Sequence, residues 1–103
     1  MNNHALYLVR MDVAHGHEAT FNEVYDREHA PNLRAVPGVR RASRYRQASA
    51  TEPRYFAAYE VENAELPTSK QWNDTSDIGR WKPEVRPYTY NKHWILSERM
   101  LTL

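Results

Sequence analysis

The sequence contains no cysteine, only three glycines and no long apolar run. The lack of cysteine excludes disulfides, thiol nucleophiles and thiolate metal sites. The scattered glycines form no phosphate-binding loop, and no serine lies in a Gly-x-Ser-x-Gly elbow. No stretch is apolar over the length of a bilayer, and the first residues do not resemble a secretory signal. We therefore expect a soluble, cytoplasmic protein that does not associate with membranes.

The sequence also lacks an excess of charge of one sign, because 14 Lys and Arg nearly balance 13 Asp and Glu and leave a net charge of +1. This balance argues against a protein that binds nucleic acid by neutralising phosphates. The 103 residues can bury one modest core, so we expect residues 1–103 to form a single domain. The aromatic residues, seven Tyr, three Trp and two Phe, indicate a pocket for a flat apolar ligand or a large interface.

The segment 21–39 has the clearest helical pattern of the chain. At about 100° per residue its apolar side chains form one stripe, and His29 lies at the edge of that stripe, one turn beyond Tyr25. Pro31 disfavours helix in the residue before it, so the helix should end near Ala30, with His29 in the last turn. There the helix dipole favours imidazolium and burial favours neutral imidazole, so the charge of His29 can move either way near neutral pH.

Strand and helix patterns alternate along the rest of the chain. Pro37 and Gly38 occupy the central positions of a type II turn that leads into a hairpin. We expect strands over 5–13, 39–48, 54–62 and 88–99, a helix that begins near Glu18, and a second helix, broken by prolines, over 66–86. This order of elements predicts an α+β protein of the ferredoxin-like βαββαβ type, with an antiparallel sheet and both helices on one side.

The predicted hairpin separates its residues by face. Odd positions, including Tyr45 and Tyr59, are mostly aromatic or apolar and should pack against the helices, whereas even positions carry most of the charge. The charge has two explanations, which remain open. One is cross-strand pairing of Arg40 with Glu60; the other is that Arg44, which faces no acid, binds a carboxylate or phosphate of a substrate.

The first strand predicts a homodimer. Residues 5–11 are apolar on both faces of the strand, although a chain of this size has helices for only one face of the sheet. A second copy of the chain is the natural cover for the other face.

Three segments stand out: GHEATFNEVYDREHAPNLRAVPGVRRASRYR, PRYFAAYEV and GRWKPEVRPY. Together they resemble the EthD-like family of the dimeric α/β-barrel superfamily, above all in the Tyr-Asp-x-Glu-His-x-Pro run that begins at Tyr25. The resemblance implies subunits with a cleft between sheet and helices, whose sheets close face to face into a barrel. It implies no single reaction, because the superfamily also contains cofactor-independent monooxygenases, polyketide cyclases and small isomerases.

His29 is the strongest candidate for a catalytic residue. Transfer of a proton near neutral pH requires a group of suitable pKa on the wall of an apolar cavity, and Tyr25 can orient His29 or donate to a substrate oxygen. The alternative is a structural histidine near a helix end. The resemblance shifts the balance towards catalysis or substrate contact.

Four further aromatic residues are candidates for substrate binding. The hydroxyls of Tyr7 and Tyr59, on the face of the sheet that should look towards the helices, can bind a carbonyl or a phenol. Trp72 and Trp81 can wall a flat substrate. For each of these four side chains the alternative is a place in an ordinary core.

Metal binding has only weak signals. His15 and His17 lie one residue apart at a strand end, and Asp26 and His29 share a helical turn, but neither pair completes a set of three ligands. We therefore predict no metal and no organic cofactor.

Two function classes follow. The first is a cofactor-free enzyme for a hydrophobic, aromatic or carbonyl-bearing metabolite, an isomerase, cyclase or lyase that moves protons through His29, or a monooxygenase. The second is a binding or accessory protein that holds such a compound without chemistry. A titrating His29 on a cavity wall would separate the two classes.

Overall fold

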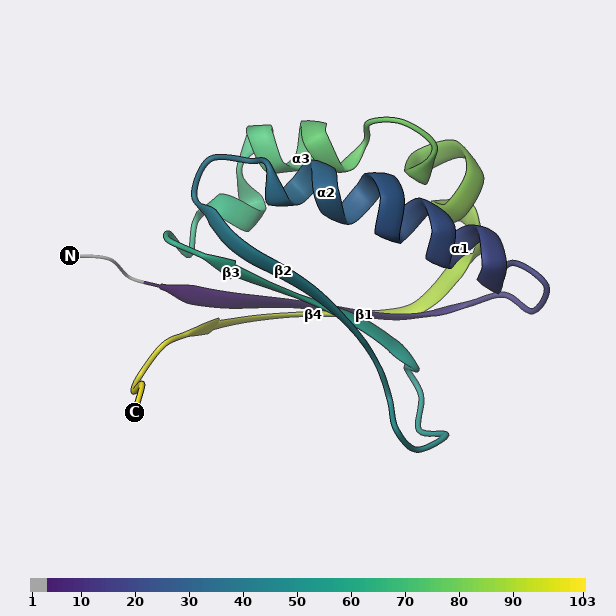
Figure 1. The fold of residues 1–103 in the computed structure, drawn as a ribbon, viewed down its shortest axis with the longest axis horizontal. Helices are drawn as coiled ribbons and strands as arrows, with labels where there is room; N and C mark the ends of the chain where they lie inside the picture. The colour runs from purple at the N-terminus through teal and green to yellow at the C-terminus, as the bar shows by residue number, and fades with distance from the viewer. Residues whose placement is uncertain (1–3) are drawn as a thin grey trace.

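The computed structural model describes residues 4–103, which form one antiparallel sheet with all helices on one of its faces (Figure 1). The strands, in the spatial order β2-β3-β1-β4, are β1 (Ala5–Val13), β2 (Val39–Arg46), β3 (Tyr55–Val61) and β4 (Thr89–Glu98). The apolar first strand is central, because β3 and β4 pair with its two edges. The predicted ferredoxin-like α+β fold is confirmed.

The helices form two runs of short pieces that together cover one face of the sheet (Figure 1). The first run is continuous and consists of α1 (Glu18–Val24), a π-helical turn (Tyr25–His29) and α2 (Ala30–Arg34). The second run is broken into a 3₁₀ turn (Leu66–Thr68), α3 (Lys70–Ser76), a π-helical turn (Trp81–Val85) and a 3₁₀ turn (Arg86–Tyr88). No helix within residues 4–103 is long and apolar enough to span a membrane.

The first helical run does not end before Pro31, so that prediction was wrong. The N–H of Ala30 bonds to the carbonyl of Tyr25, which widens the turn directly before the proline. Proline has no N–H and its ring clashes with the carbonyl four residues earlier, so a regular α-turn is disfavoured at this point. The chain widens into a π turn instead of stopping, as helices often do at functional sites. His29 therefore lies within the helical run and not at its end.

A β-bulge in β2 reverses which residues of this strand face the helices. Val39 pairs with Val61, but Arg41 pairs with Glu60, so Arg40 is the extra residue. The Arg41 Nε lies 3.5 Å from a Glu60 carboxylate oxygen, whereas the predicted Arg40–Glu60 pair does not form. Beyond the bulge, even positions of β2 share the helix side of the sheet.

Two predicted orientations change as a result of this bulge. Arg44 pairs with Ala57 and faces the helices. Tyr45 pairs with Phe56, stacks on its ring at 4.9 Å between centroids, and is 50 % exposed on the helix-free face. The prediction that Tyr45 packs against the helices was therefore wrong. A bulge inserts one residue and so moves every later side chain of the strand to the opposite face.

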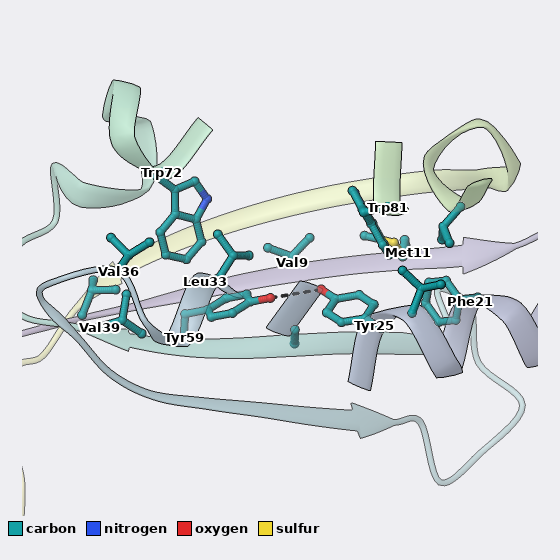
Figure 2. Close-up of a cluster of buried hydrophobic side chains, with 14 of the residues drawn as sticks. Val9, Met11, Phe21, Tyr25, Leu33, Val36, Val39, Tyr59, Trp72 and Trp81 are labelled. Carbon is teal, nitrogen blue, oxygen red and sulfur yellow. Dashed lines mark hydrogen bonds between the residues drawn. The ribbon is translucent and has the colours of Figure 1, made fainter. Parts of the chain in front are cut away.

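The core lies between the sheet and the two helical runs (Figure 2). Aromatic side chains from distant segments meet there, and Phe21, Tyr25, Trp72 and Trp81 are all at least 96 % buried. The predicted turn that precedes β2 is present, with a positive φ of 98° at Gly38 and a bond of 3.0 Å from the Val39 N–H to the Val36 carbonyl.

Candidate functional site

A cavity of about 470 Å³ lies between the sheet and the helices. This volume falls within the range of small-molecule pockets. Six of the residues that the sequence singled out line it: Tyr7, Tyr25, His29, Tyr59, Trp72 and Trp81. The cavity thus brings together residues from β1, β3 and both helical runs, as expected for a cleft beneath the helices.

His29 is a buried part of this wall, with 6 % of its surface exposed. Its ring stacks on Trp81, with centroids 4.0 Å apart and planes 9° from parallel, and meets the edge of Tyr25 at 5.1 Å. Its Nδ1 atom is fully buried and has no hydrogen-bond partner among residues 4–103. A buried polar atom without a partner is costly, so its presence on a cavity wall indicates a place for a ligand group.

The imidazole of His29 is neutral at physiological pH. Burial lowers its pKa to about 3, and the positive charges of Arg86 and Arg44 act in the same direction, while Asp77 opposes them. Of the two opposing effects considered from the sequence, burial is therefore the larger. A neutral ring offers a nitrogen lone pair to a ligand proton.

The hydroxyls of Tyr25 and Tyr59 point towards each other inside the core (Figure 2). Tyr59 donates a long hydrogen bond of 3.4 Å to the Tyr25 oxygen. Burial raises the pKa of Tyr25 to about 12, although this bond and the charge of Arg44 lower it, and burial also raises the pKa of Tyr59. Both phenols therefore keep their protons. Because Tyr25 accepts from Tyr59, its own proton remains available to a further acceptor.

Tyr7 extends the aromatic wall towards the opening. It is half-buried, and its ring lies 5.7 Å from Trp72 in an edge-on arrangement and 6.5 Å from Tyr59. Burial raises the pKa of the Tyr7 hydroxyl too. Trp72 contacts both tyrosines and is held by α3, where the Ser69 side chain caps the helix by accepting from the Trp72 N–H at 3.2 Å.

Arg44, unlike the other predicted binding residues, does not line the cavity. Its guanidinium carbon lies 4.3 Å from the centre of the Tyr25 ring. One nitrogen donates to Asp26 at 2.6 Å and another to Asn22 at 3.0 Å. The structure therefore places Arg44 against the ring of Tyr25. Asp26 and Asn22 accept the hydrogen bonds that a substrate anion was expected to accept.

The mouth of the cavity has residues that sequence reasoning missed. Asp77 and Arg86 come from the broken second helical run, Lys92 and Trp94 from β4. The alternation of Lys92 with Trp94 was a usable signal, because it placed both on one face of the last strand. The same alternation failed for Tyr88 and Tyr90, which are 41 % and 50 % exposed, since a bulge at Asn91 separates them from Lys92.

The weak metal signals do not assemble into a site. His17 stacks on Tyr88 with centroids 3.7 Å apart, and the exposed His15 lies 4.0 Å from Glu18. Asp26 is paired with Arg44. In the described part of the chain, residues 4–103, no three His, Cys, Asp or Glu side chains are grouped so that they can hold a metal ion.

Comparison with solved structures gives matches along nearly the whole chain. A putative antibiotic biosynthesis monooxygenase from Bordetella bronchiseptica matches with a TM-score of 0.75 at 16 % identity, over 96 % of this chain and 99 % of the other. An EthD family protein from Bacillus halodurans matches with a TM-score of 0.66 at 13 % identity, over 93 % and 99 %. The chain shares their ferredoxin-like fold. The resemblance to EthD-like proteins is thus confirmed at the level of the fold.

A third match is a variant of MhuD that holds two manganese protoporphyrin IX molecules per active site. Its TM-score is 0.75 at 16 % identity, and the alignment covers 96 % of this chain and 97 % of the other. No protein-family profile and no curated protein matches the sequence. At these identities the comparisons establish the architecture, and the chemistry has to be argued from the cavity.

Proposed function

We propose that the protein is a cofactor-free enzyme that binds a flat, hydrophobic, aromatic or carbonyl-bearing molecule in this cavity and transfers a proton with His29. The observation that carries the proposal is the buried Nδ1 of His29, which has no hydrogen-bond partner among the described residues and lies on the wall of an aromatic cavity. A reaction of the isomerase, cyclase or lyase type needs no more than such a base and a proton donor.

The low pKa of His29 constrains how the proton moves. A neutral imidazole in an apolar site is a weak base, because the imidazolium that it forms is poorly solvated. When His29 removes a proton from a bound C–H or O–H, the substrate becomes an enolate or phenolate beside the new imidazolium. This opposite charge stabilises the imidazolium and raises the pKa of His29 at the moment of transfer. Tyr25, a protonated phenol beside His29, donates to the substrate oxygen that gains charge.

The alternative is a binding protein without chemistry. The specific observation in its favour is the same pKa of about 3, since a ring that stays neutral can simply complete a hydrogen bond to a ligand O–H or N–H. The two candidates share the cavity and differ in whether a proton leaves the bound molecule.

Deuterium exchange into a bicyclic aromatic ketone, 2-tetralone, tests this difference. If the protein is a proton-transfer enzyme, it speeds the replacement of the protons next to the carbonyl in D₂O, as followed by NMR. His29→Gln should slow the catalysed exchange about a hundredfold or more. His15→Gln is the matched control, because its imidazole is fully exposed outside the cavity.

The outcomes of this experiment distinguish the two functions and test the use of the cavity. Binding of 2-tetralone without catalysed exchange supports the binding protein. Exchange that His29→Gln leaves unchanged moves the catalytic role to Tyr7 or Tyr59. Absence of binding by calorimetry contradicts the proposed use of the cavity.

A homodimer is the second part of the proposal. The helix-free face of the sheet carries Leu6, Leu8, Phe56 and Ile95, each half-buried or exposed. Pairing with a second copy of the chain would remove this apolar surface from water and close the barrel that the EthD-like resemblance implies.

A further inference from the structure

The cavity has an aromatic interior and a charged mouth. Indole, phenol and imidazole rings line the interior, whereas Asp77, Arg86 and Lys92 contribute the only formal charges among its lining residues within 4–103. A ligand that fills the space therefore meets rings at one end and charge at the other. The balance of that charge decides which polar group the ligand presents at the mouth.

Two of the three charges neutralise each other. An Arg86 nitrogen lies 2.7 Å from an Asp77 carboxylate oxygen and also contacts the Ser76 carbonyl at 3.3 Å. Asp77 has a second cation, Lys82, at 3.7 Å. The hydrogen bond from Arg86, together with the positive charges of Arg86 and Lys82, lowers the pKa of Asp77, so the carboxylate remains ionised. Neither Asp77 nor Arg86 is left with an unmatched charge for a ligand.

Lys92 is the unmatched cation. Among residues 4–103, no carboxylate lies within 4.0 Å of its ammonium nitrogen, and no side chain or carbonyl accepts a hydrogen bond from it. Every other lysine of the described chain has an acid close by: Lys70 has Asp74 at 2.6 Å and Lys82 has Asp77 at 3.7 Å. The one lysine on the cavity wall is thus the one without an internal partner.

A β-bulge directly before Lys92 fixes the backbone there. Asn91, the residue before it, has a φ of 53° and is the extra residue of a bulge between the Arg10 and Asp12 pairings. The side chain of Asn91 donates to Asp12 at 3.0 Å, and Asp12 is 97 % buried. Bulges of this kind aim side chains beside active sites. Here the bulge lies between the beginning of β4 at Thr89 and Lys92, whose side chain lines the cavity.

We propose that the cavity selects a planar aromatic ligand that carries an anionic group, such as a carboxylate, and that Lys92 is the residue that recognises this group. Trp94, which also lines the mouth and is 58 % exposed, provides the outer surface for the ring system. The inference rests on the proposed function, because it names the ligand class of the same cavity.

The experiment compares two probes with the same naphthalene ring, 2-naphthoate and the uncharged 2-naphthol, by calorimetry at neutral pH and low salt. Wild type should bind naphthoate about fivefold more tightly than naphthol, the upper range for a partly exposed charge pair. Lys92→Met should bring the ratio to about one or below, and Lys92→Arg should retain the preference. Lys70→Met is the control, because it removes an equal charge outside the cavity.

The outcomes separate this inference from the proposed function. Binding of both probes with no preference, or a preference that Lys92→Met leaves intact, overturns the role of Lys92 while the cavity keeps its function. Failure of both probes to bind overturns the use of the cavity and the role of Lys92 together. Added salt should weaken naphthoate binding and leave naphthol binding unchanged; the same loss for both probes would also contradict the inference.

Discussion

The imidazole of His29 lies parallel to the indole of Trp81, 4.0 Å from it, although 52 positions separate the two residues in the chain. Trp81 comes from the second helical run and covers a histidine of the first. This contact contributes to the burial that lowers the pKa of His29 to about 3, and so converts a residue that is ordinarily half-charged near neutral pH into a neutral one.

Stability should depend on pH through His29. The unfolded chain binds a proton at His29 near its usual pKa of 6.5, whereas the folded protein does so only near pH 3. Between these values the unfolded state holds the extra proton, so stability falls as the pH falls below about 6.5. Above that pH the group has no effect.

Urea unfolding at several pH values measures this effect. From about pH 6.5 to about pH 5, wild type should lose about 2 kcal/mol more than His29→Gln, because the variant lacks the titrating group. Parallel pH profiles for the two proteins would mean that His29 titrates normally when folded. In that case the pH dependence of any activity should show a limb near neutral pH, which we do not expect.

Arg44 should contribute to stability without contributing to ligand affinity. Arg44→Met removes the bonds to Asp26 and Asn22 and the contact with the Tyr25 ring, so we expect a loss of about 2 kcal/mol. Affinity for 2-naphthol should not change, because Arg44 is not on the cavity wall. A large loss of affinity at equal folded fraction would restore Arg44 as a substrate anchor.

The helix-free face should make the protein dimeric. Light scattering at micromolar concentration should give close to twice the mass of one chain. Ile95→Lys, on this face and 40 % exposed, should shift the population towards monomer. Ile78→Lys is the matched control, since Ile78 is 54 % exposed and follows α3 in the helical layer. A wild-type monomer at that concentration would contradict the proposed dimeric barrel.

Metal removal should have no effect on ligand binding or on proton exchange. The expectation rests on the lack of any three grouped ligand side chains in residues 4–103, where Asp77, the one carboxylate that lines the cavity, is paired with Arg86. Treatment with a chelator followed by the 2-tetralone exchange assay checks this. Loss of exchange that a divalent metal restores would bring His15 and His17 back as candidates.

Local chemistry explains why the order of elements was predictable from the sequence. Hydrophobic periodicity separates helix from strand within a few residues, and Gly38 at positive φ or Pro67 at a helix start acts on its own neighbours. The same local rules placed Tyr25 and His29 one turn apart, and both line the cavity.

The tertiary structure alone decided which way certain side chains face and whether His29 is charged. The bulges at Arg40 and Asn91 depend on pairing with a partner strand, and each reverses the alternation that a single strand suggests. The reversal at Arg40 places Arg44 beneath the helices. The pKa of His29 depends on burial by residues such as Trp81 and on the charge of Arg86. Both residues are far from His29 in the sequence. Local pattern therefore pointed to His29 and the aromatic residues of the cavity wall but not to its charged mouth, and long-range packing set the direction and charge of the side chains.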